Sequence, residues 1–296
     1  MRVADVATFA ADPQSIAAAF IAACAAELQT PKPGNVHVFA DGHGMTAADF
    51  LASAEAAAPF IAASQSTVGA RIAGAVEATW ARVAQNTNLG IVLLCAPLAQ
   101  AAATAPSADL REETERVLEA LDVSDADAAF RAIAHARPAG LGDAPQHDVR
   151  APAQTTLLDA MKAAAGRDRI AWQYANGFND IFDLGLKTLA EARARVGDAT
   201  LATLWVYAAF LAAFPDSHIA RKQGLEAAET VRAEAARFET NLRSAQGRDA
   251  AFELALKFDR VLKRRGLNPG TSADLTVAVL FADCLAAILA RTRKNG

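Results

Sequence analysis

Apolar residues recur at spacings of three and four along most of this chain, while the alternation of β-branched residues that marks strands is nearly absent. Spacings of three and four place apolar side chains on one face of an α-helix. The pattern therefore predicts an all-α fold. We expect about a dozen helices, packed as a single compact multi-helix bundle that forms one domain over residues 1–296.

Breaks in the apolar pattern set the expected helix boundaries. The predicted helices cover residues 14–29, 47–64, 68–84, 89–103, 111–121, 125–136, 155–165, 168–195, 199–214, 217–245, 249–265 and 272–291. Three of the starts have the spacing of a capping box with Asp in place of Glu, namely Thr46 with Asp49, Ser124 with Asp127, and Thr271 with Asp274.

Composition narrows the classes of function. With 296 residues and 53% hydrophobic content, the chain can bury a large core. A net charge of -4 with scattered Lys and Arg argues against nucleic-acid binding. The sequence shows no apolar run of about 20 residues, so no membrane span is expected. Cys24, Cys95 and Cys284 lie far apart in apolar helical sequence, which predicts free thiols and a cytoplasmic location.

Four polar breaks are the candidate functional segments, and each ends where a helix should begin. The first, residues 30–46 (TPKPGNVHVFADGHGMT), contains two prolines, three glycines and two histidines and predicts an ordered loop. The others are residues 86–90 (NTNLG), 215–222 (PDSHIARK) and 268–274 (NPGTSAD). Because a helix N-terminus offers unpaired N–H groups, four such ends could surround one anion-rich ligand.

Each break also has a purely structural explanation. Asp216 can act as an N-cap, Thr87 or Asn88 can cap another helix, and Thr271 with Asp274 can form a capping box. The polar residues after Asp216 also match an ordinary solvated helix end. The functional reading therefore depends on whether the four breaks meet.

Histidines outside helices give two further possibilities. His37 and His43 lie six residues apart, which fits no zinc motif, so they are either hydrogen-bonding or acid–base groups or a solvent-exposed pair. His147 and Asp148 lie among prolines and glycines, unlike the helical ligands of metal phosphohydrolases. They belong either to a loop that closes over the site or to a plain surface loop.

A polar cluster follows that loop at the start of the long helix predicted over residues 168–195. Arg169 and Gln173 are four residues apart and so share one helix face. That face points either into a pocket or to water.

The motifs together resemble a known family. TPKPG, a Gly-His-x-Met element, NT-x-x-G, D-S-x-I-x-R and PG-x-S-A-D-L occur in this order over residues 30–275 and resemble the triphosphoribosyl-dephospho-CoA synthase family. The resemblance implies an all-helical enzyme that transfers the 5-triphosphoribosyl group of ATP to the 2′-hydroxyl of dephospho-CoA. Adenine is released and an α-ribosyl link is formed. The matching positions are Lys32, Gly34, His43, Met45, Asn86, Thr87, Gly90, Asp216, Ile219, Pro269, Gly270, Ser272, Ala273 and Asp274.

Departures from the family pattern keep other substrates open. Where the family reads NTHKG, this chain has Asn88 and Leu89 in place of His and Lys. Gln173 stands in place of an acidic residue, His37 in place of an Asp, and DSH in place of DTN. This form resembles a branch linked to tetrahydromethanopterin-dependent C1 metabolism, which suggests an aminophenyl-ribitol acceptor and phosphoribosyl pyrophosphate as an alternative donor. A non-enzymatic helical binding protein is the third possibility.

The chemistry of ribosyl transfer assigns roles to the candidates. Displacement at C1′ passes through an oxocarbenium-like state and needs a carboxylate, for which Asp216 or Asp274 is the candidate. His43 or His218 could protonate the departing base. Mg²⁺ is the expected cofactor, with Asp41 and Asp216 as candidate ligands.

The remaining candidates are expected to bind the substrate and its phosphates. They are Lys32, Gly34, Asn35, His37, Asn86, Thr87, Asn88, Arg221, Lys222, Ser272, Arg169 and Gln173. The expected partners are small-molecule substrates, and a homodimer is a further prediction.

Overall fold

The computed structural model describes residues 10–105, 107, 109–138 and 147–295. Within these residues the chain forms fourteen α-helices and one short π-helical segment, with no strand beyond isolated bridges. The all-α prediction is confirmed. The helices are α1 (Pro13–Leu28), α2 (Ala47–Ile61), α3 (Val68–Val83), α4 (Leu89–Thr104), α5 (Leu110–Glu119), α6 (Val123–Ala136), α7 (Leu157–Ala164), α8 (Arg169–Ala175), η1 (Asp180–Gly185), α9 (Leu186–Val196), α10 (Ala199–Ala213), α11 (Ser217–Gln223), α12 (Leu225–Ser244), α13 (Arg248–Arg264) and α14 (Gly270–Asn295).

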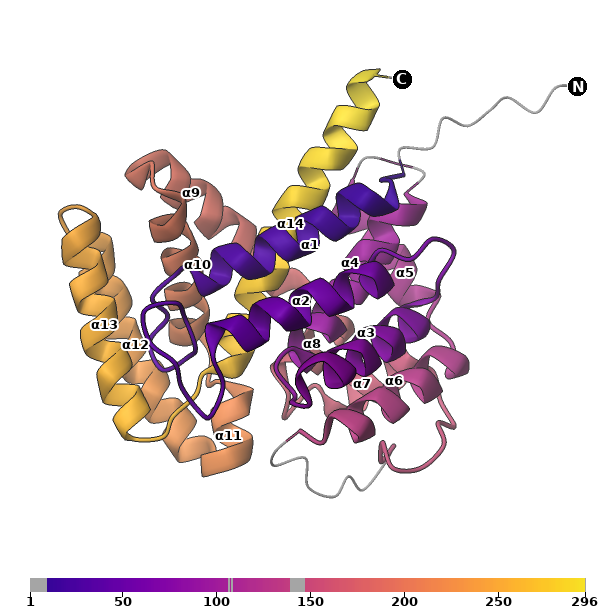
Figure 1. The fold of residues 1–296 in the computed structure, drawn as a ribbon, viewed down its shortest axis with the longest axis horizontal. Helices are drawn as coiled ribbons and strands as arrows, with labels where there is room; N and C mark the ends of the chain where they lie inside the picture. The colour runs from indigo at the N-terminus through magenta and orange to yellow at the C-terminus, as the bar shows by residue number, and fades with distance from the viewer. Residues whose placement is uncertain (1–9, 106, 108, 139–146, 296) are drawn as a thin grey trace, which may run out of the picture.

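Helix α14 is the centre of the molecule. It packs against α1, α4 and α10, and also touches α5, α8, α9, α11 and η1. Figure 1 shows two groups of helices beside it, with α2, α3 and α6–α8 on one side and α9–α13 on the other. A main apolar cluster contains residues from helices of both groups and from α14.

Helix α14 carries apolar side chains on nearly all sides, and this allows other helices to surround it. By length and composition, its segment Gly270–Arg293 could cross a membrane, and so could the bent pair α10–α11 taken together. The apolar pattern of the sequence had predicted no such segment. In the structure 61% of the α14 segment is buried inside the bundle, as in the core helix of a globular protein.

Two predicted helices are interrupted. The helix expected over residues 168–195 is divided into α8, η1 and α9, because Gly177 and Phe178 adopt φ values of +60° and +58°. The helix expected over residues 217–245 ends at Gly224, which has a φ of +91°, and resumes as α12. A residue with positive φ ends an α-helix, but the spacing of apolar residues does not reveal where such a residue lies.

Helix caps were predicted with mixed success. The capping box of Thr46 and Asp49 at the start of α2 is confirmed. For α6 the box is formed by Asp122 and Asp125, two residues before the predicted Ser124 pair. Two neighbouring candidates with the same spacing cannot be separated by local sequence alone.

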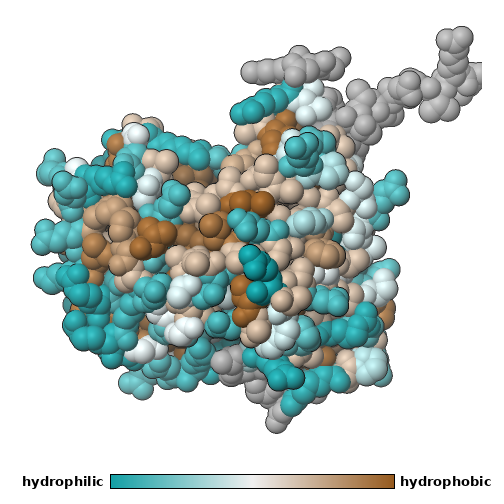
Figure 2. All heavy atoms as spheres, viewed as in Figure 1, coloured by the Kyte–Doolittle hydropathy of each residue, from teal (hydrophilic) through white to brown (hydrophobic). Residues whose placement is uncertain are grey.

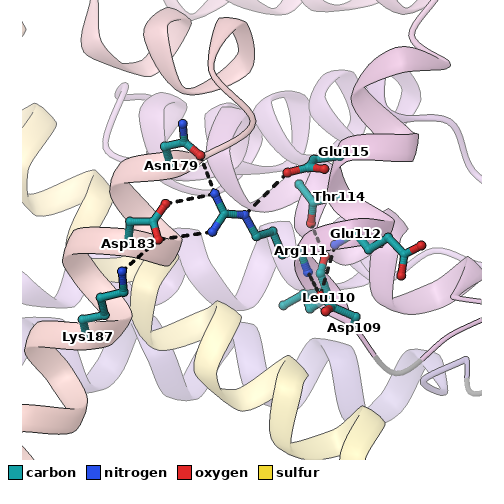
Figure 3. A network of polar contacts seen from close by, with 9 residues as sticks. All are labelled: Asp109, Leu110, Arg111, Glu112, Thr114, Glu115, Asn179, Asp183 and Lys187. Carbon is teal, nitrogen blue, oxygen red and sulfur yellow. Dashed lines mark hydrogen bonds and ion pairs between the residues drawn. The ribbon is translucent and has the colours of Figure 1, made fainter.

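The π-helical segment is tied to α5 by a network of charged side chains (Figure 3). Arg111 of α5 donates to Asn179 at 2.6 Å and to Asp183 at 2.9 Å. Asp183 also accepts from Lys187 at 3.1 Å, and Glu115 lies 3.5 Å from Arg111. Single exposed ion pairs contribute little to stability, but this network joins two elements distant in the sequence.

The surface mixes polar and apolar side chains. Figure 2 shows tan and brown residues across the middle of one face, with hydrophilic residues along its borders. Large apolar side chains are exposed at Val38, Phe39, Leu51, Phe60, Val123 and Leu225. The three cysteines are free thiols, as predicted, and two of them are buried. The homodimer remains a prediction.

Close packing of η1 against α14 gives a test of the fold. A Cβ at Gly185 would lie 2.2 Å from Val279 Cγ2 and 3.0 Å from Phe210 Cζ, whereas one at Gly166 would meet nothing within 4 Å. We expect Gly185→Ala to lower the free energy of unfolding by about 1–3 kcal/mol, because overpacking forces neighbours apart. Urea unfolding measures this, with Gly166→Ala as the control. Equal stability of the two variants would contradict the packing described here.

Candidate functional site

All four polar breaks line one cavity of about 520 Å³. The structure therefore brings together segments that are far apart in the sequence. The lining residues from the breaks are Asn35, His43 and Met45; Asn86, Thr87, Leu89 and Gly90; His218, Arg221 and Lys222; and Asn268, Gly270, Thr271, Ala273 and Asp274. Helices α1, α2, α6, α7 and α8 complete the wall.

The opening loop is fixed to the turn before α14. Gly34 has a φ of +81°, and a Cβ there would lie 2.7 Å from Pro269 Cδ, so the close approach requires glycine. The Gly34 amide donates to Asp259 Oδ1 of α13 at 2.9 Å. Asn35 Nδ2 donates to Asn268 Oδ1 at 2.8 Å, which joins two cavity-lining side chains. Gly34 therefore has a structural role outside the cavity lining.

His43 lies in the same loop, at the edge of the cavity. Its Nε2 is 2.9 Å from the carbonyl oxygen of Gly34. Because a carbonyl oxygen only accepts, Nε2 carries the proton in this contact, which leaves Nδ1 of a neutral ring as an acceptor. His43 can therefore accept a hydrogen bond from a bound ligand.

Lys32 is buried and does not line the cavity, although the sequence suggested phosphate binding. Its Nζ lies 2.8 Å from Glu27 Oε1 and donates to the Val36 carbonyl at 2.5 Å. Burial lowers the pKa of Lys32 and raises that of Glu27, and the attraction between the two opposes both shifts. Glu27 does line the cavity, so Lys32 acts by holding a cavity carboxylate in place.

His37 is also buried outside the cavity. Its Nε2 lies 3.5 Å from Asp259 Oδ1, and burial lowers its pKa. Lys263 Nζ lies 3.2 Å from the same carboxylate oxygen. Burial raises the pKa of Asp259, but the contacts with His37, Lys263 and Gly34 outweigh it and the pKa is lowered overall. This cluster anchors the opening loop to α13 and is not positioned to touch a ligand.

Asp216 caps two helices at once. Its Oδ1 accepts from the amides of His218 and Ile219 at 2.9 and 3.2 Å. Its Oδ2 accepts from the Ser272 amide and hydroxyl at 2.8 and 2.9 Å. Asp216 is 1% exposed, and neither it nor Ser272 lines the cavity. The structure thus assigns Asp216 a capping role, in place of the catalytic and metal-binding roles suggested by the sequence.

The capping box predicted for Thr271 and Asp274 does not form. Helix α14 begins at Gly270, one residue before Thr271, so Thr271 lies inside the helix and cannot be its N-cap. Thr271 Oγ1 instead accepts from the His218 amide at 3.2 Å. The Asp216 carboxylate occupies the place of the cap. The Asp274 side chain therefore caps no backbone amide, and it lies on the cavity wall.

Asp274 is the most unusual carboxyl group of the cavity. Within the described part of the chain it has no hydrogen bond or ion pair, and a Cβ at Gly90 would lie only 2.0 Å from its Oδ2. Burial, followed by repulsion from Asp216 and Glu27, raises the pKa of Asp274 well above its usual range. A protonated carboxyl group at neutral pH can serve as a general acid.

His218 lies on the cavity wall near the start of α14. Burial lowers its pKa to about 3, with further contributions from Lys222, Arg221 and His43. Its Nε2 is buried and has no hydrogen-bond partner among the described residues. The ring is therefore neutral at pH 7, so His218 does not fit the suggested role of proton donor to a leaving group, although it can bind a ligand by a hydrogen bond.

Only some residues of the NTNLG segment line the cavity. Asn86 and Thr87 line the cavity, and Asn86 Oδ1 accepts from the Leu89 amide at 3.3 Å. Asn88 does not line it, because its Nδ2 donates to Thr79 Oγ1 at 3.0 Å. Leu89, in the place of the family's lysine, presents an apolar side chain to the cavity.

Arg169 and Gln173 bind a neighbouring carboxylate and do not line the cavity. Arg169 Nε donates to Asp180 Oδ2 at 2.7 Å, and Gln173 Nε2 donates to the same oxygen at 2.6 Å. The guanidinium also lies over the rings of Trp172 and Phe214, at 3.7 and 4.3 Å from their centroids. These contacts position α8 relative to η1 and α10.

Several cavity residues were missed in the sequence. They are Glu27, Arg137, Arg167 and Asp168. Glu27 interrupts the end of an apolar run, and this break in the pattern was the available signal. His147 and Asp148 also line the cavity, so they are not part of a plain surface loop; residues 139–146 lie outside the described residues.

The predicted magnesium pair does not form a site. Asp41 is exposed and outside the cavity, and both oxygens of Asp216 are occupied. The described residues contain no group of three or more His, Cys, Asp or Glu that could hold a metal ion. Mg²⁺ bound chiefly by nucleotide phosphates needs only one or two protein carboxylates, and Asp168 and Asp274 provide such oxygens on the cavity wall.

Comparisons with known proteins agree with the geometry. The sequence model of the CitG family, ATP:dephospho-CoA triphosphoribosyl transferase, matches residues 13–293. A crystal structure of a candidate triphosphoribosyl-dephospho-CoA synthase from Archaeoglobus fulgidus matches with a TM-score of 0.60 and 26% identity, over 78% of this chain and 96% of that one. No curated protein matches the chain. The resemblance is confirmed, and neither match supports the pterin-pathway acceptor or a non-enzymatic role.

The buried pair of Lys32 and Glu27 gives the first test of the site. Lys32→Met should lower the free energy of unfolding by about 3–5 kcal/mol, because it leaves a buried carboxylate without its partner. The double variant Glu27→Gln with Lys32→Met should recover most of this loss. Chemical unfolding at pH 7 measures both. An unchanged stability of Lys32→Met would mean that Lys32 is free to serve as a phosphate ligand.

The lowered pKa of His218 predicts a pH dependence of stability. Between pH 6.5 and about 3 the unfolded chain binds a proton at His218 that the folded chain does not, so this contribution to stability is lost as the pH falls. From pH 7 to pH 5 the wild type should lose about 1–2 kcal/mol more than His218→Gln, after allowance for partial exposure. Urea titrations at the two pH values test this, and equal losses would show that His218 is not held neutral.

Proposed function

This chain belongs to the ATP:dephospho-CoA triphosphoribosyl transferase family, and from this we propose that its cavity transfers the 5-triphosphoribosyl group of ATP to the 2′-hydroxyl of dephospho-CoA. The observation that carries the proposal is the position of Asp274. This unpaired carboxyl group, with its raised pKa, lies where the four sequence motifs meet. The cavity volume is in the range of small-molecule sites.

The reaction breaks the bond between C1′ of ATP and adenine and forms a bond between C1′ and the acceptor oxygen. Adenine gains a proton and the acceptor hydroxyl loses one. A single displacement inverts C1′, so the β-linked donor ATP gives the α-linked product that the family resemblance implies. Such displacements use two carboxyl groups on opposite sides of the sugar, one as acid and one as base.

Asp274 is suited to the acid role. Its raised pKa favours the protonated form of the carboxyl group, which can donate to the departing adenine. After this step the carboxylate can stabilise the positive charge that develops at C1′. Protonation by Asp274 replaces the role suggested for His43 or His218 in the sequence.

Asp168 is suited to the base role. It lines the cavity, and the salt bridge of its Oδ2 with Arg221 Nη1, at 2.7 Å, positions the carboxylate to accept the hydroxyl proton. Its Oδ1 also accepts from the amides at the start of α8, which fixes its orientation. His43 and Asn35 can then orient the substrates by hydrogen bonds.

Mg²⁺ remains part of the proposal. Bound mainly by the phosphate oxygens of ATP, it would reduce their negative charge. The cytoplasmic location also stays a prediction.

Product analysis tests the proposal directly. Mass spectrometry of the full chain incubated with Mg²⁺, ATP and dephospho-CoA should show free adenine and triphosphoribosyl-dephospho-CoA. Parallel reactions contain phosphoribosyl pyrophosphate as donor or an aminophenyl-ribitol as acceptor. A product from the ribitol with none from dephospho-CoA would overturn the proposed acceptor.

Asp274→Asn should lower kcat by about 10²–10⁴-fold, because the amide cannot donate an acidic proton. Asp283→Asn, on an exposed part of the same helix, is the matched control and should keep kcat within about twofold. Because the protonated form of Asp274 is required, the wild-type kcat/KM should fall as the pH rises through its raised pKa. Steady-state kinetics across pH measures this, and full activity of Asp274→Asn would exclude the acid role.

A further inference from the structure

The charges on the cavity wall are not balanced against one another. Each carboxylate other than Asp274 has a cationic partner; the pairs are Glu27 with Lys32, Asp168 with Arg221, and Asp148 with Arg150. Three further cations line the cavity, namely Arg137, Arg167 and Lys222. Four cations and four carboxyl groups line the cavity, and within the described residues this pairing leaves three of the cations, but only one carboxyl group, Asp274, without an ion-pair partner.

These three cations have no anionic partner within the described part of the chain. No ion pair involves Arg137 or Lys222, and Arg167 Nη1 donates only to the Ala163 carbonyl at 3.3 Å. All three side chains are exposed.

Two of the cations lie on segments that a salt bridge joins. Asp168 and Arg221, at 2.7 Å, connect the turn before α8 to α11. Arg167 precedes Asp168, Lys222 follows Arg221, and both line the cavity.

Arg137 occupies a backbone position that favours glycine. It is the C-cap of α6, with φ and ψ of 46° and 55° in the left-handed region. Helices usually end with glycine at such a position, because a side chain is strained there. Arg137 lines the cavity and has no anionic partner among the described residues, so its side chain is available to a ligand.

Three of the helix starts at the cavity do not offer a better anion site. The amides at the starts of α11 and α14 donate to Asp216, and those at the start of α8 donate to Asp168. At the start of α4, by contrast, the N-cap side chain makes no capping hydrogen bond, and Gly90 and Ile91 line the cavity. Away from α4, phosphate oxygens in this cavity are bound mainly by cationic side chains.

We infer that Arg137, Arg167 and Lys222 form the subsite for the polyphosphate tail of a nucleotide. The inference rests on the proposed function for the identity of the donor, but the subsite itself requires only a nucleotide with several phosphates. The guanidinium groups of Arg137 and Arg167 can bind phosphate oxygens in pairs, and Lys222 adds a third charge at the cavity mouth. Affinity should therefore increase with phosphate count.

Calorimetric titration of the full chain with Mg²⁺ and ATP, ADP or AMP tests the subsite without requiring turnover. Wild-type affinity should follow the order ATP, ADP, AMP. Arg167→Gln, Lys222→Gln and Arg137→Gly should each weaken ATP binding by about 10-fold and AMP binding by less than about twofold. Arg264→Gln, at an exposed arginine of α13 outside the cavity, is the charge control and should change neither affinity.

Arg137→Gly separates a binding role from a structural role. Glycine suits the left-handed backbone, so the variant should melt at the same or a higher temperature while it loses ATP affinity. Ala84→Gly, at the left-handed C-cap of α3, is the matched control and should leave ATP affinity unchanged.

The outcomes distinguish this inference from the proposed transfer. Equal loss of ATP and AMP affinity in the three variants, or no loss in any, overturns the subsite, even if product forms. Conversely, a dependence on phosphate count that disappears in the variants supports the subsite even if dephospho-CoA is not a substrate. In that case only the proposed acceptor fails.

Discussion

The Asp216 carboxylate is the interaction on which the site depends. A buried carboxylate is stable only when hydrogen bonds replace its lost hydration, and Asp216 meets this condition with four bonds shared between the starts of α11 and α14. Two helices separated by more than fifty residues are thereby joined at their first turns. His218 follows on one helix and Asp274 on the other, so a structural bond places both on the cavity wall.

This arrangement changes how the cavity can bind an anion. Helix starts are common phosphate sites because their amides are unpaired, but here Asp216 and Asp168 occupy those amides with carboxylates of the protein itself. Binding energy for a phosphate tail near α8, α11 and α14 then has to come from side chains. Paired carboxylates keep most of the wall electrically neutral, which leaves Asp274 as the one unpaired carboxyl group within the described lining.

The apolar period was sufficient to predict most helices, because burial of one face dominates their formation. Helices α1, α3, α4 and α10 begin and end within two residues of the expected positions. The breaks at Phe178 and Gly224 were missed, since a left-handed residue leaves no trace in that period. For the site, the convergence of four motifs was predictable, but the direction of each side chain was not. Lys32 turns inward to Glu27 and Asn88 turns to Thr79, and both contacts depend on residues brought together only by the fold.

Two departures from the family pattern change the charge of the cavity wall or the direction of a side chain. Leu89 removes a cation from the wall formed by α4, and Asn88 is engaged away from the ligand. If the donor still carries a phosphate tail, its charge must be met elsewhere. Arg137 and Arg167 lie on a different part of the wall, near the ends of α6 and α7, where the sequence motifs gave no reason to look. The proposed subsite of Arg137, Arg167 and Lys222 would supply, outside the NTNLG motif, positive charge that Leu89 does not provide within it.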